Sequence, residues 1–140
     1  MSLSKIICFA ALSLTWMGPA AHAEPVPSRG KKARPLFDGR SLDGWEGLKD
    51  FWRVEEGALT GGSLTEQVKR NEFLATTRDY TNFIVRLKIK LTGTEGFLNS
   101  GFQIRSQRVP NDSEMAGYQC DFGDPTWWGC VYDESRRNKV

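Results

Sequence analysis

Residues 83–91 alternate between apolar and polar side chains with a period of two. An extended chain would carry all the apolar side chains on one face and the basic ones on the other; the apolar set is Phe83, Val85, Leu87, Ile89 and Leu91, and the basic set is Arg86, Lys88 and Lys90. On a helix the same residues would be scattered around the axis. The pattern therefore predicts a β-strand with one buried face.

Shorter segments follow the same rule elsewhere in the chain. Residues 52–55 and 58–60 flank Glu56-Gly57, which predicts a hairpin with a two-residue turn. Further strands are expected within 71–77, 101–105, 118–122 and 128–133. Because no segment combines helical periodicity with capping residues, the chain is predicted to be all-β, with short antiparallel strands in a sandwich or jelly roll.

The N-terminus has the features of an export signal. Lys5 supplies a positive charge, residues 6–17 form an apolar run, and Ala21-His22-Ala23 is a small-x-small cleavage site. These features predict a signal peptide over 1–23 and a secreted or periplasmic protein. An uncleaved anchor is the alternative, although the run is shorter than the ~20 apolar residues that span a bilayer. After cleavage no membrane span is expected.

Residues 24–35 are rich in proline and basic residues, which predicts a flexible polar linker. The folded domain is therefore expected at 36–140. Nineteen Lys and Arg residues oppose seventeen Asp and Glu residues, for a net charge of +2. This balance argues against a dedicated nucleic-acid-binding protein, which usually has a clear basic excess.

Signal cleavage would remove His22, the only histidine of the chain. The mature protein would then have no Ser-His-Asp triad, Cys-His pair or His-rich zinc site. Catalysis would have to use carboxylates, Arg, Lys, Tyr or a cysteine. Cys120 and Cys130 flank a predicted turn, and they are expected either to form a cross-strand disulfide or to remain two small buried thiols.

Four polar side chains alternate away from the apolar residues of their strands: Gln103, Arg105, Gln119 and Asp121. On neighbouring strands they would form one polar patch, with Lys88 and Lys90 beyond it. Such a patch suits a polyhydroxylated ligand, because each hydroxyl group both donates and accepts hydrogen bonds. The alternative is the ordinary solvated face of an antiparallel sheet.

Four acids lie close together near the C-terminus: Asp121, Asp124, Asp133 and Glu134. They could supply a general base or oxygen ligands for a divalent cation such as calcium, but their spacing matches no EF-hand loop. Structural acids at strand ends are the alternative, and no cofactor is evident. Beside these acids, Trp127-Trp128 could stack on a sugar ring or pack into the core.

The chain reaches Val140 after about seven candidate strands, whereas a jelly roll has about eight. The sequence therefore predicts a domain that is incomplete at its C-terminus.

Several sequence blocks resemble one known family. Residues 36–45, LFDGRSLDGW, resemble the opening motif LFDGKSLDGW of the 3-keto-disaccharide hydrolase domain family. Residues 51–59 and 82–90 resemble its next two blocks, NSGFQIR at 99–105 resembles its NSGxxxR strand, and GYQCD at 117–121 resembles its GYExQ strand. The blocks keep the family order from residue 36 to about residue 134.

The resemblance implies a concanavalin-like β-sandwich that acts on glycosides oxidised at C3, with further strands after residue 140. Where the family usually has Glu and Gln, this chain has Gln119 and Asp121, so the acid is displaced by two residues on the same face. The implied reaction removes the C2 proton with a carboxylate, eliminates the C1 substituent and then adds water.

In this interpretation Asp121 is the base and Arg105 stabilises the enolate oxygen. The carbohydrate substrate would be bound by Gln103, Gln119, Trp127 and Asp124. Two alternatives lack the reaction: a non-catalytic carbohydrate-binding module on the same sandwich, and a cell-surface interaction domain without a sugar ligand.

Overall fold

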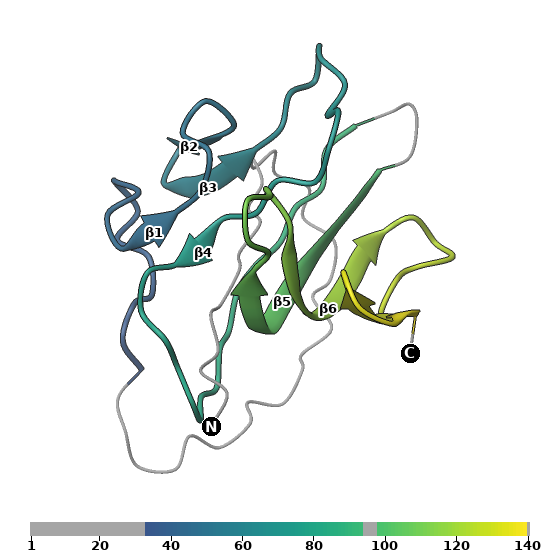
Figure 1. Cartoon of the computed structure of the whole chain (residues 1–140). Helices are drawn as coiled ribbons and strands as arrows, with labels where there is room; N and C mark the ends of the chain where they lie inside the picture. The colour runs from purple at the N-terminus through teal and green to yellow at the C-terminus, as the bar shows by residue number, and fades with distance from the viewer. Residues whose placement is uncertain (1–32, 94–97, 140) are drawn as a thin grey trace, which may run out of the picture.

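The computed structural model describes residues 33–93 and 98–139. The predicted signal peptide and most of the predicted linker lie outside these residues. All regular structure in the described ranges is β, in eight strands (Figure 1): β1 (Trp45–Glu46), β2 (Trp52–Glu55), β3 (Ala58–Gly61), β4 (Ala75–Thr76), β5 (Asn99–Arg108), β6 (Met115–Gly123), β7 (Val131–Glu134) and β8 (Asn138–Lys139). Within the same ranges, no helix has the length and apolar character needed to cross a membrane.

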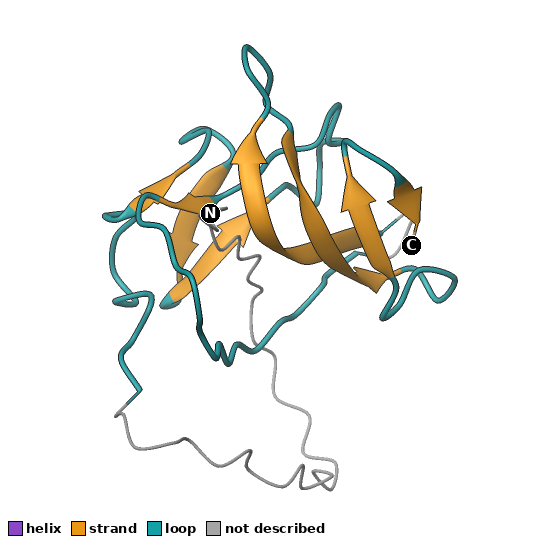
Figure 2. Ribbon diagram, turned by 60° about the horizontal axis from the view of Figure 1, so that its bottom comes forward, coloured by secondary structure: helices purple, strands orange, loops and turns teal. Residues whose placement is uncertain are grey.

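The strands form one larger sheet and two small ribbons (Figure 2). The sheet has the order β5-β6-β7-β8, and the ribbons pair β1 with β4 and β2 with β3. Every pairing is antiparallel. The predicted all-β, antiparallel architecture of a β-sandwich is therefore confirmed.

The predicted hairpin at Glu56-Gly57 is also confirmed. Strands β2 and β3 pair in register from Trp52 opposite Gly61 to Glu55 opposite Ala58. Glu56 and Gly57 have φ values of 48° and 74°. Two consecutive positive φ values match the right-handed twist of the flanking strands, which is why this turn type closes tight hairpins.

The core is built mainly by the N-terminal half of the described chain. One buried cluster contains Trp45, Trp52, Leu59 and Leu74, with Phe51 packed against it. The expectation that Trp45 and Trp52 pack in the core is confirmed. A second buried cluster brings Phe73 and Ala75 onto Met115 of β6, so that the ribbons and the larger sheet share apolar contacts.

The strand predicted over 83–91 is not observed. These residues belong to no strand, although burial alternates from 83 to 88: Phe83, Val85 and Leu87 are half-buried, whereas Ile84, Arg86 and Lys88 are exposed. The alternation ends at Ile89, which is exposed. Alternation indicates which face of an extended segment meets the core. A strand also requires a neighbouring chain to complete the hydrogen-bond ladder, and none of the described strands pairs with this segment.

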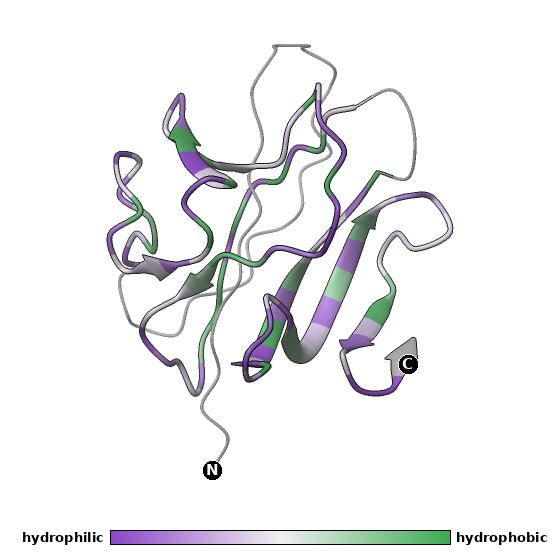
Figure 3. Cartoon of the chain, turned by 45° about the horizontal axis from the view of Figure 1, so that its top comes forward, coloured by the Kyte–Doolittle hydropathy of each residue, from purple (hydrophilic) through white to green (hydrophobic). Residues whose placement is uncertain are grey.

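The neighbouring positions of β5 and β6 follow the prediction. Gln103 lies opposite Gln119 and Gly101 lies opposite Asp121. Figure 3 shows alternating hydrophilic and hydrophobic bands along the long strands of this sheet. The register shifts between Ile104 and Gln107, where Arg105 adopts a φ of 52°. This β-bulge adds a residue to β5, so that side-chain alternation restarts beyond it.

Of the two alternatives for the cysteines, the disulfide is not formed, since Cys120 and Cys130 are both free thiols. Cys120 lies opposite Val131, so Cys130 is one residue out of register with it. Successive residues of a strand point to opposite faces, and a disulfide needs side chains that converge. The expectation of two buried thiols is also wrong for Cys120, which is exposed.

Candidate active site

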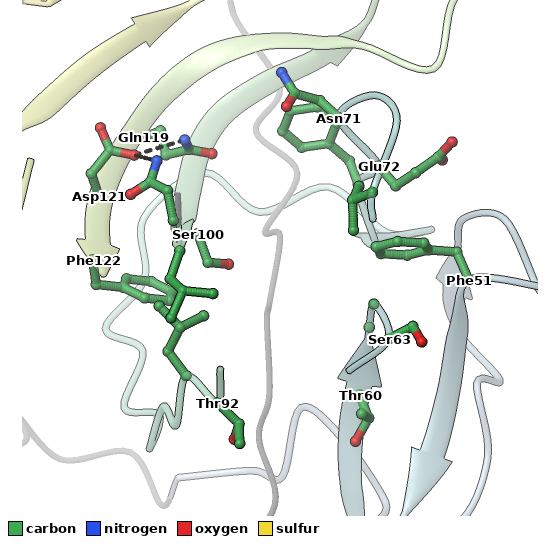
Figure 4. A pocket seen from close by; sticks show the side chains of 18 of the residues that line it. Phe51, Thr60, Ser63, Asn71, Glu72, Thr92, Ser100, Gln119, Asp121 and Phe122 are labelled. Carbon is green, nitrogen blue, oxygen red and sulfur yellow. Dashed lines mark hydrogen bonds between the residues drawn. The ribbon is translucent and has the colours of Figure 1, made fainter. Parts of the chain in front are cut away.

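A cavity of about 690 Å³ lies between the β2–β3 ribbon and the larger sheet. Its lining comes from the ribbon, from the loop between Gly61 and Phe73, and from strands β5, β6 and β7. Figure 4 shows Gln119 and Asp121 on one side of it and Phe51 and Ser63 on the other.

Gln119 connects two carboxylates on the cavity wall. Its Nε2 atom donates to Asp121 Oδ1 at 2.9 Å and to Glu134 Oε2 at 3.5 Å. Gln119 and Asp121 are two residues apart on β6, so they share one face, and Glu134 comes from the neighbouring strand β7. Asn99 Nδ2 of β5 also contacts Asp121 Oδ1, at 3.5 Å.

Gly101 makes room for this arrangement. A Cβ atom at position 101 would overlap the Cγ and Cδ atoms of Gln119. Gly101 lies opposite Asp121 in the β5–β6 ladder. The Gln119 side chain can therefore lie across β5 and reach its carboxylate partners because residue 101 has no side chain.

The protein environment raises the pKa of both carboxyl groups. Burial raises the pKa of Asp121, and the hydrogen bonds from Gln119 and Asn99 only partly oppose it. Burial, followed by the negative charges of Glu114 and Asp121, raises the pKa of Glu134 to about 7. Near neutral pH Glu134 can therefore hold a proton, and the negative charge of Asp121 is one of the causes; two carboxyl groups in unlike environments are typical of acid–base catalysis.

Glu114 is a third acid near the pair, and no pattern in the sequence distinguishes it from other surface acids. It immediately precedes β6, accepts a hydrogen bond from Asn71 Nδ2 at 3.0 Å and accepts another from Ser135 Oγ at 3.3 Å. Glu134 was recognised only as one of four clustered acids. The pairing of β6 with β7 places the Glu134 carboxylate next to Gln119.

Two aromatic side chains complete this part of the lining. Trp127 and Tyr132 meet edge to face with ring centroids 5.9 Å apart, and both line the cavity. Burial, then the charges of Glu134, Asp121 and Glu114, raises the pKa of Tyr132, so its phenol stays protonated. Trp127 thus lines the cavity beside these acids, whereas Trp128 is exposed outside the cavity lining.

The polar patch predicted from alternation is only partly correct. Gln119 and Asp121 are neighbours on one face, but that face is buried rather than solvated. Cys120, which alternates with them, is exposed, while Phe102 and Tyr118 are half-buried. Lys90 lines the cavity, and Lys88 does not.

Three predicted site residues lie outside the cavity lining. Arg105 is exposed at the bulge, which turns it out of the face that carries Gln119 and Asp121. Gln103 is fully buried, and its Nε2 atom donates to the Met115 carbonyl at 3.0 Å. Asp124 accepts the Thr126 N–H at 2.8 Å and so organises the β6–β7 loop.

Asp133 has a structural role. Its buried carboxylate forms ion pairs with Arg136 and Arg137 in the β7–β8 hairpin, and Arg137 also donates to the Tyr118 hydroxyl at 3.1 Å. Burial alone would raise the pKa of Asp133, but the hydrogen bonds and charges of Arg137 and Arg136 hold it below its usual value.

The comparison with known proteins identifies the family. The chain matches the family described as 3-keto-alpha-glucoside-1,2-lyase-like domain over residues 32–140. The chain belongs to this family. Neither a curated protein nor a solved structure matches the chain.

Two of the family's motif blocks contribute residues to the cavity lining. The block at 99–105 supplies Asn99, Ser100 and Gly101, and the block at 117–121 supplies Gln119 and Asp121. Asn99 Oδ1 and Ser100 Oγ are buried and have no hydrogen-bond partner among the described residues. Buried polar atoms without partners are costly, so these two atoms are suited to receive a polar ligand.

A metal site finds no support in the described part of the chain, where no group of three or more His, Cys, Asp or Glu residues is arranged to hold an ion.

Proposed function

We propose that this domain cleaves glucosides oxidised at C3 by elimination, with Asp121 as the base and Glu134 as the acid. The observation that carries the proposal is the Gln119 amide bridging these two carboxylates on the wall of a cavity. The family membership supports a function on 3-keto-glycosides. The residue roles and the order of steps are the proposed part.

The reaction begins at C2, whose proton is acidified by the neighbouring ketone. The Asp121 carboxylate takes this proton, and the C–H electron pair forms the enolate. The enolate then collapses, a C1–C2 double bond forms, and the C1–O bond breaks. Glu134 gives its proton to the departing oxygen. For hydrolysis, water adds to C1, Glu134 takes its proton, and Asp121 returns the first proton to C2.

The enolate oxygen needs a hydrogen-bond donor. The sequence predicts Arg105 for this role. The exposed position of Arg105 removes the reason for that assignment. The Ser100 hydroxyl and the Asn99 amide are the better candidates, since both line the cavity near Asp121. Donors fixed before the reaction stabilise developing charge more effectively than water does.

A non-catalytic carbohydrate-binding module remains the second candidate. The Trp127–Tyr132 pair favours it, because aromatic rings on a cavity wall can stack on the apolar face of a sugar. A binding module would have no use for one ionised and one protonated carboxyl group held together. We therefore favour the enzyme. We further propose that the protein is exported and meets its carbohydrate outside the cytoplasm, as its N-terminal residues predict.

The two functions can be separated with matched ligands. The full chain would be given a 3-keto α-glucoside, the same compound deuterated at C2, and the unoxidised parent sugar. The enzyme should release a keto sugar from the first, act more slowly on the second and leave the third intact. A binding module should bind the parent sugar and cleave none of them. Equal rates for the two keto substrates would contradict rate-limiting proton abstraction at C2.

A further inference from the structure

Several exposed apolar side chains belong to the lining of the same cavity. Leu64 is 76% exposed, Val68 is 48% exposed and Leu91 is 39% exposed, and all three line it. A single exposed leucine on a protein surface requires no explanation. A group of them on one concave surface is typical of a binding site for an apolar ligand.

These side chains form a wall with the ring of Phe51. A methyl group added at Gly62 would lie 3.9 Å from both Phe51 Cζ and Val68 Cγ2, so both side chains lie close to Gly62. Figure 4 places Phe51 and Ser63, the neighbour of Leu64, across the cavity from Gln119 and Asp121. We call Phe51, Leu64 and Val68 the apolar wall.

Two pairs of charged residues line the cavity beside the apolar wall, and in each pair the two side chains contact one another. Arg53 contacts Glu55 at 2.6 Å and donates to the Gly62 carbonyl, while Arg70 contacts Glu72 at 2.8 Å. Because these groups satisfy one another, they offer little to the hydroxyl groups of a second sugar. Lys69 also lines the cavity, and it forms no ion pair with a carboxylate among the described residues.

The polar side of the cavity has the opposite character. Asn99 Oδ1 and Ser100 Oγ lack partners there, beside the bridged carboxylates. On this side Leu91 approaches the end of β6, since its Cδ2 atom would lie 2.7 Å from a Cβ atom at Gly123. The cavity therefore has its unpartnered polar atoms on the side of Asn99 and Ser100, where Leu91 also lies, and the exposed side chains of Leu64 and Val68 on the side of Phe51.

We infer that the leaving group of the substrate is an apolar, aromatic aglycone rather than a second sugar. This inference rests on the proposed function, because the bridged carboxylates fix where the glucosyl unit lies. The glucosyl unit would occupy the polar end near Asp121, and the aglycone would cover Phe51, Leu64 and Val68. Covering these exposed side chains removes apolar surface from water, which favours binding.

The test measures binding of unoxidised ligands, so that it does not depend on turnover. Calorimetry on the full chain would compare 4-nitrophenyl α-glucoside with maltose. The aryl glucoside should bind about tenfold more tightly, and Leu64→Ser and Val68→Ser should each remove most of that advantage while leaving maltose unchanged. Ile84→Ser is the matched control, because Ile84 is 64% exposed and lies outside the cavity lining.

Several outcomes would overturn the inference: equal affinity for the two glucosides, no binding of the aryl glucoside, or an equal effect of Ile84→Ser. A dimer that becomes monomeric in Leu64→Ser would also overturn it, because the apolar wall would then be an interface between copies. If a 3-keto disaccharide is cleaved while the two affinities are equal, the inference alone fails. If the aryl glucoside binds as expected but no 3-keto glycoside is cleaved, the proposed function fails and the apolar wall stands.

Discussion

The amide nitrogen of Gln119 lies 2.9 Å from Asp121 Oδ1, and these two residues are separated by a single position on β6. The same nitrogen also contacts Glu134 on β7 at 3.5 Å. An amide group has two N–H bonds, so one side chain can hold two carboxylates without carrying a charge of its own. The geometry thus keeps two acids close together while leaving their pKa values raised.

Removing the acid should change the dependence of turnover on pH. Glu134 has to be protonated to act, and its pKa is about 7, so wild-type turnover should fall as the pH rises through 7. Glu134→Gln should lower turnover of a 3-keto disaccharide by about 10²-fold and abolish that alkaline limb. The measurement is a pH–rate profile of both proteins.

A substrate with a good leaving group provides the control for Glu134. Nitrophenolate departs without a proton, so Glu134→Gln should cleave a nitrophenyl 3-keto-glucoside almost as fast as the wild type. An equal loss of rate on both substrates would show that Glu134 acts in some other way.

Removing the base should affect every substrate. Asp121→Asn keeps the shape of the side chain and removes its charge, so turnover should fall by roughly 10²- to 10⁴-fold whatever the leaving group. Binding of the parent glucoside should change little. Lys88→Ala is the control, because Lys88 is exposed and lies outside the cavity lining. Wild-type turnover by Asp121→Asn would mean that another group takes the C2 proton.

The sequence predicted best where local chemistry determines structure. The β2–β3 hairpin follows from Glu56-Gly57 alone, because a two-residue turn fixes the register of the strands that it joins. The adjacency of Gln119 and Asp121 follows equally from alternation along one strand. Neither conclusion requires knowledge of distant contacts.

The errors concern features that depend on the rest of the fold. Alternation cannot show which face of β5 and β6 is buried, and here the polar face is the inner one, with Gln103 fully buried. A bulge is not visible in the residue pattern, so Arg105 was placed on the wrong face. Glu114 lies in a segment without alternation of polar and apolar residues. Only the folded chain brings its negative charge close enough to raise the pKa of Glu134.

The bulge itself provides a test of the corrected role of Arg105. A φ of 52° costs a residue with a side chain about 1–2 kcal/mol, a cost that glycine does not carry. Arg105→Gly should therefore leave turnover unchanged and keep or raise the urea midpoint of unfolding. A large loss of turnover in a protein that remains folded would restore Arg105 to the active site.

The absence of a side chain at Gly101 should be as important for turnover as the Gln119 side chain that occupies the space. Gly101→Ala would push Gln119 away from Asp121 and should cost about 1–3 kcal/mol of stability together with a loss of turnover. Adding Gln119→Ser relieves the overlap, so the double variant should regain stability but not turnover. Urea unfolding and steady-state rates separate the two effects. Full turnover by Gly101→Ala would show that the bridge is unnecessary.

Asp133 should stabilise the fold in a pH-dependent way. Its ion pairs with Arg136 and Arg137 hold its folded-state pKa below the ordinary value of 3.8. The stabilisation is therefore present above pH 3.8 and is lost as the pH falls through the lower folded-state pKa. Asp133→Asn should lower the urea midpoint at pH 7, and the difference from wild type should shrink near pH 3. An unchanged midpoint at pH 7 would contradict this structural role.

The exposed thiol of Cys120 has a practical consequence. It lies between Gln119 and Asp121 in sequence, but on the opposite face of β6, because successive residues of a strand alternate. A fluorescent reporter attached to Cys120 would be one strand thickness from the bridged carboxylates without occupying the space where a ligand binds. With Cys8 and Cys130 replaced by serine, such a labelled protein would allow ligand exchange to be followed in real time by optical spectroscopy.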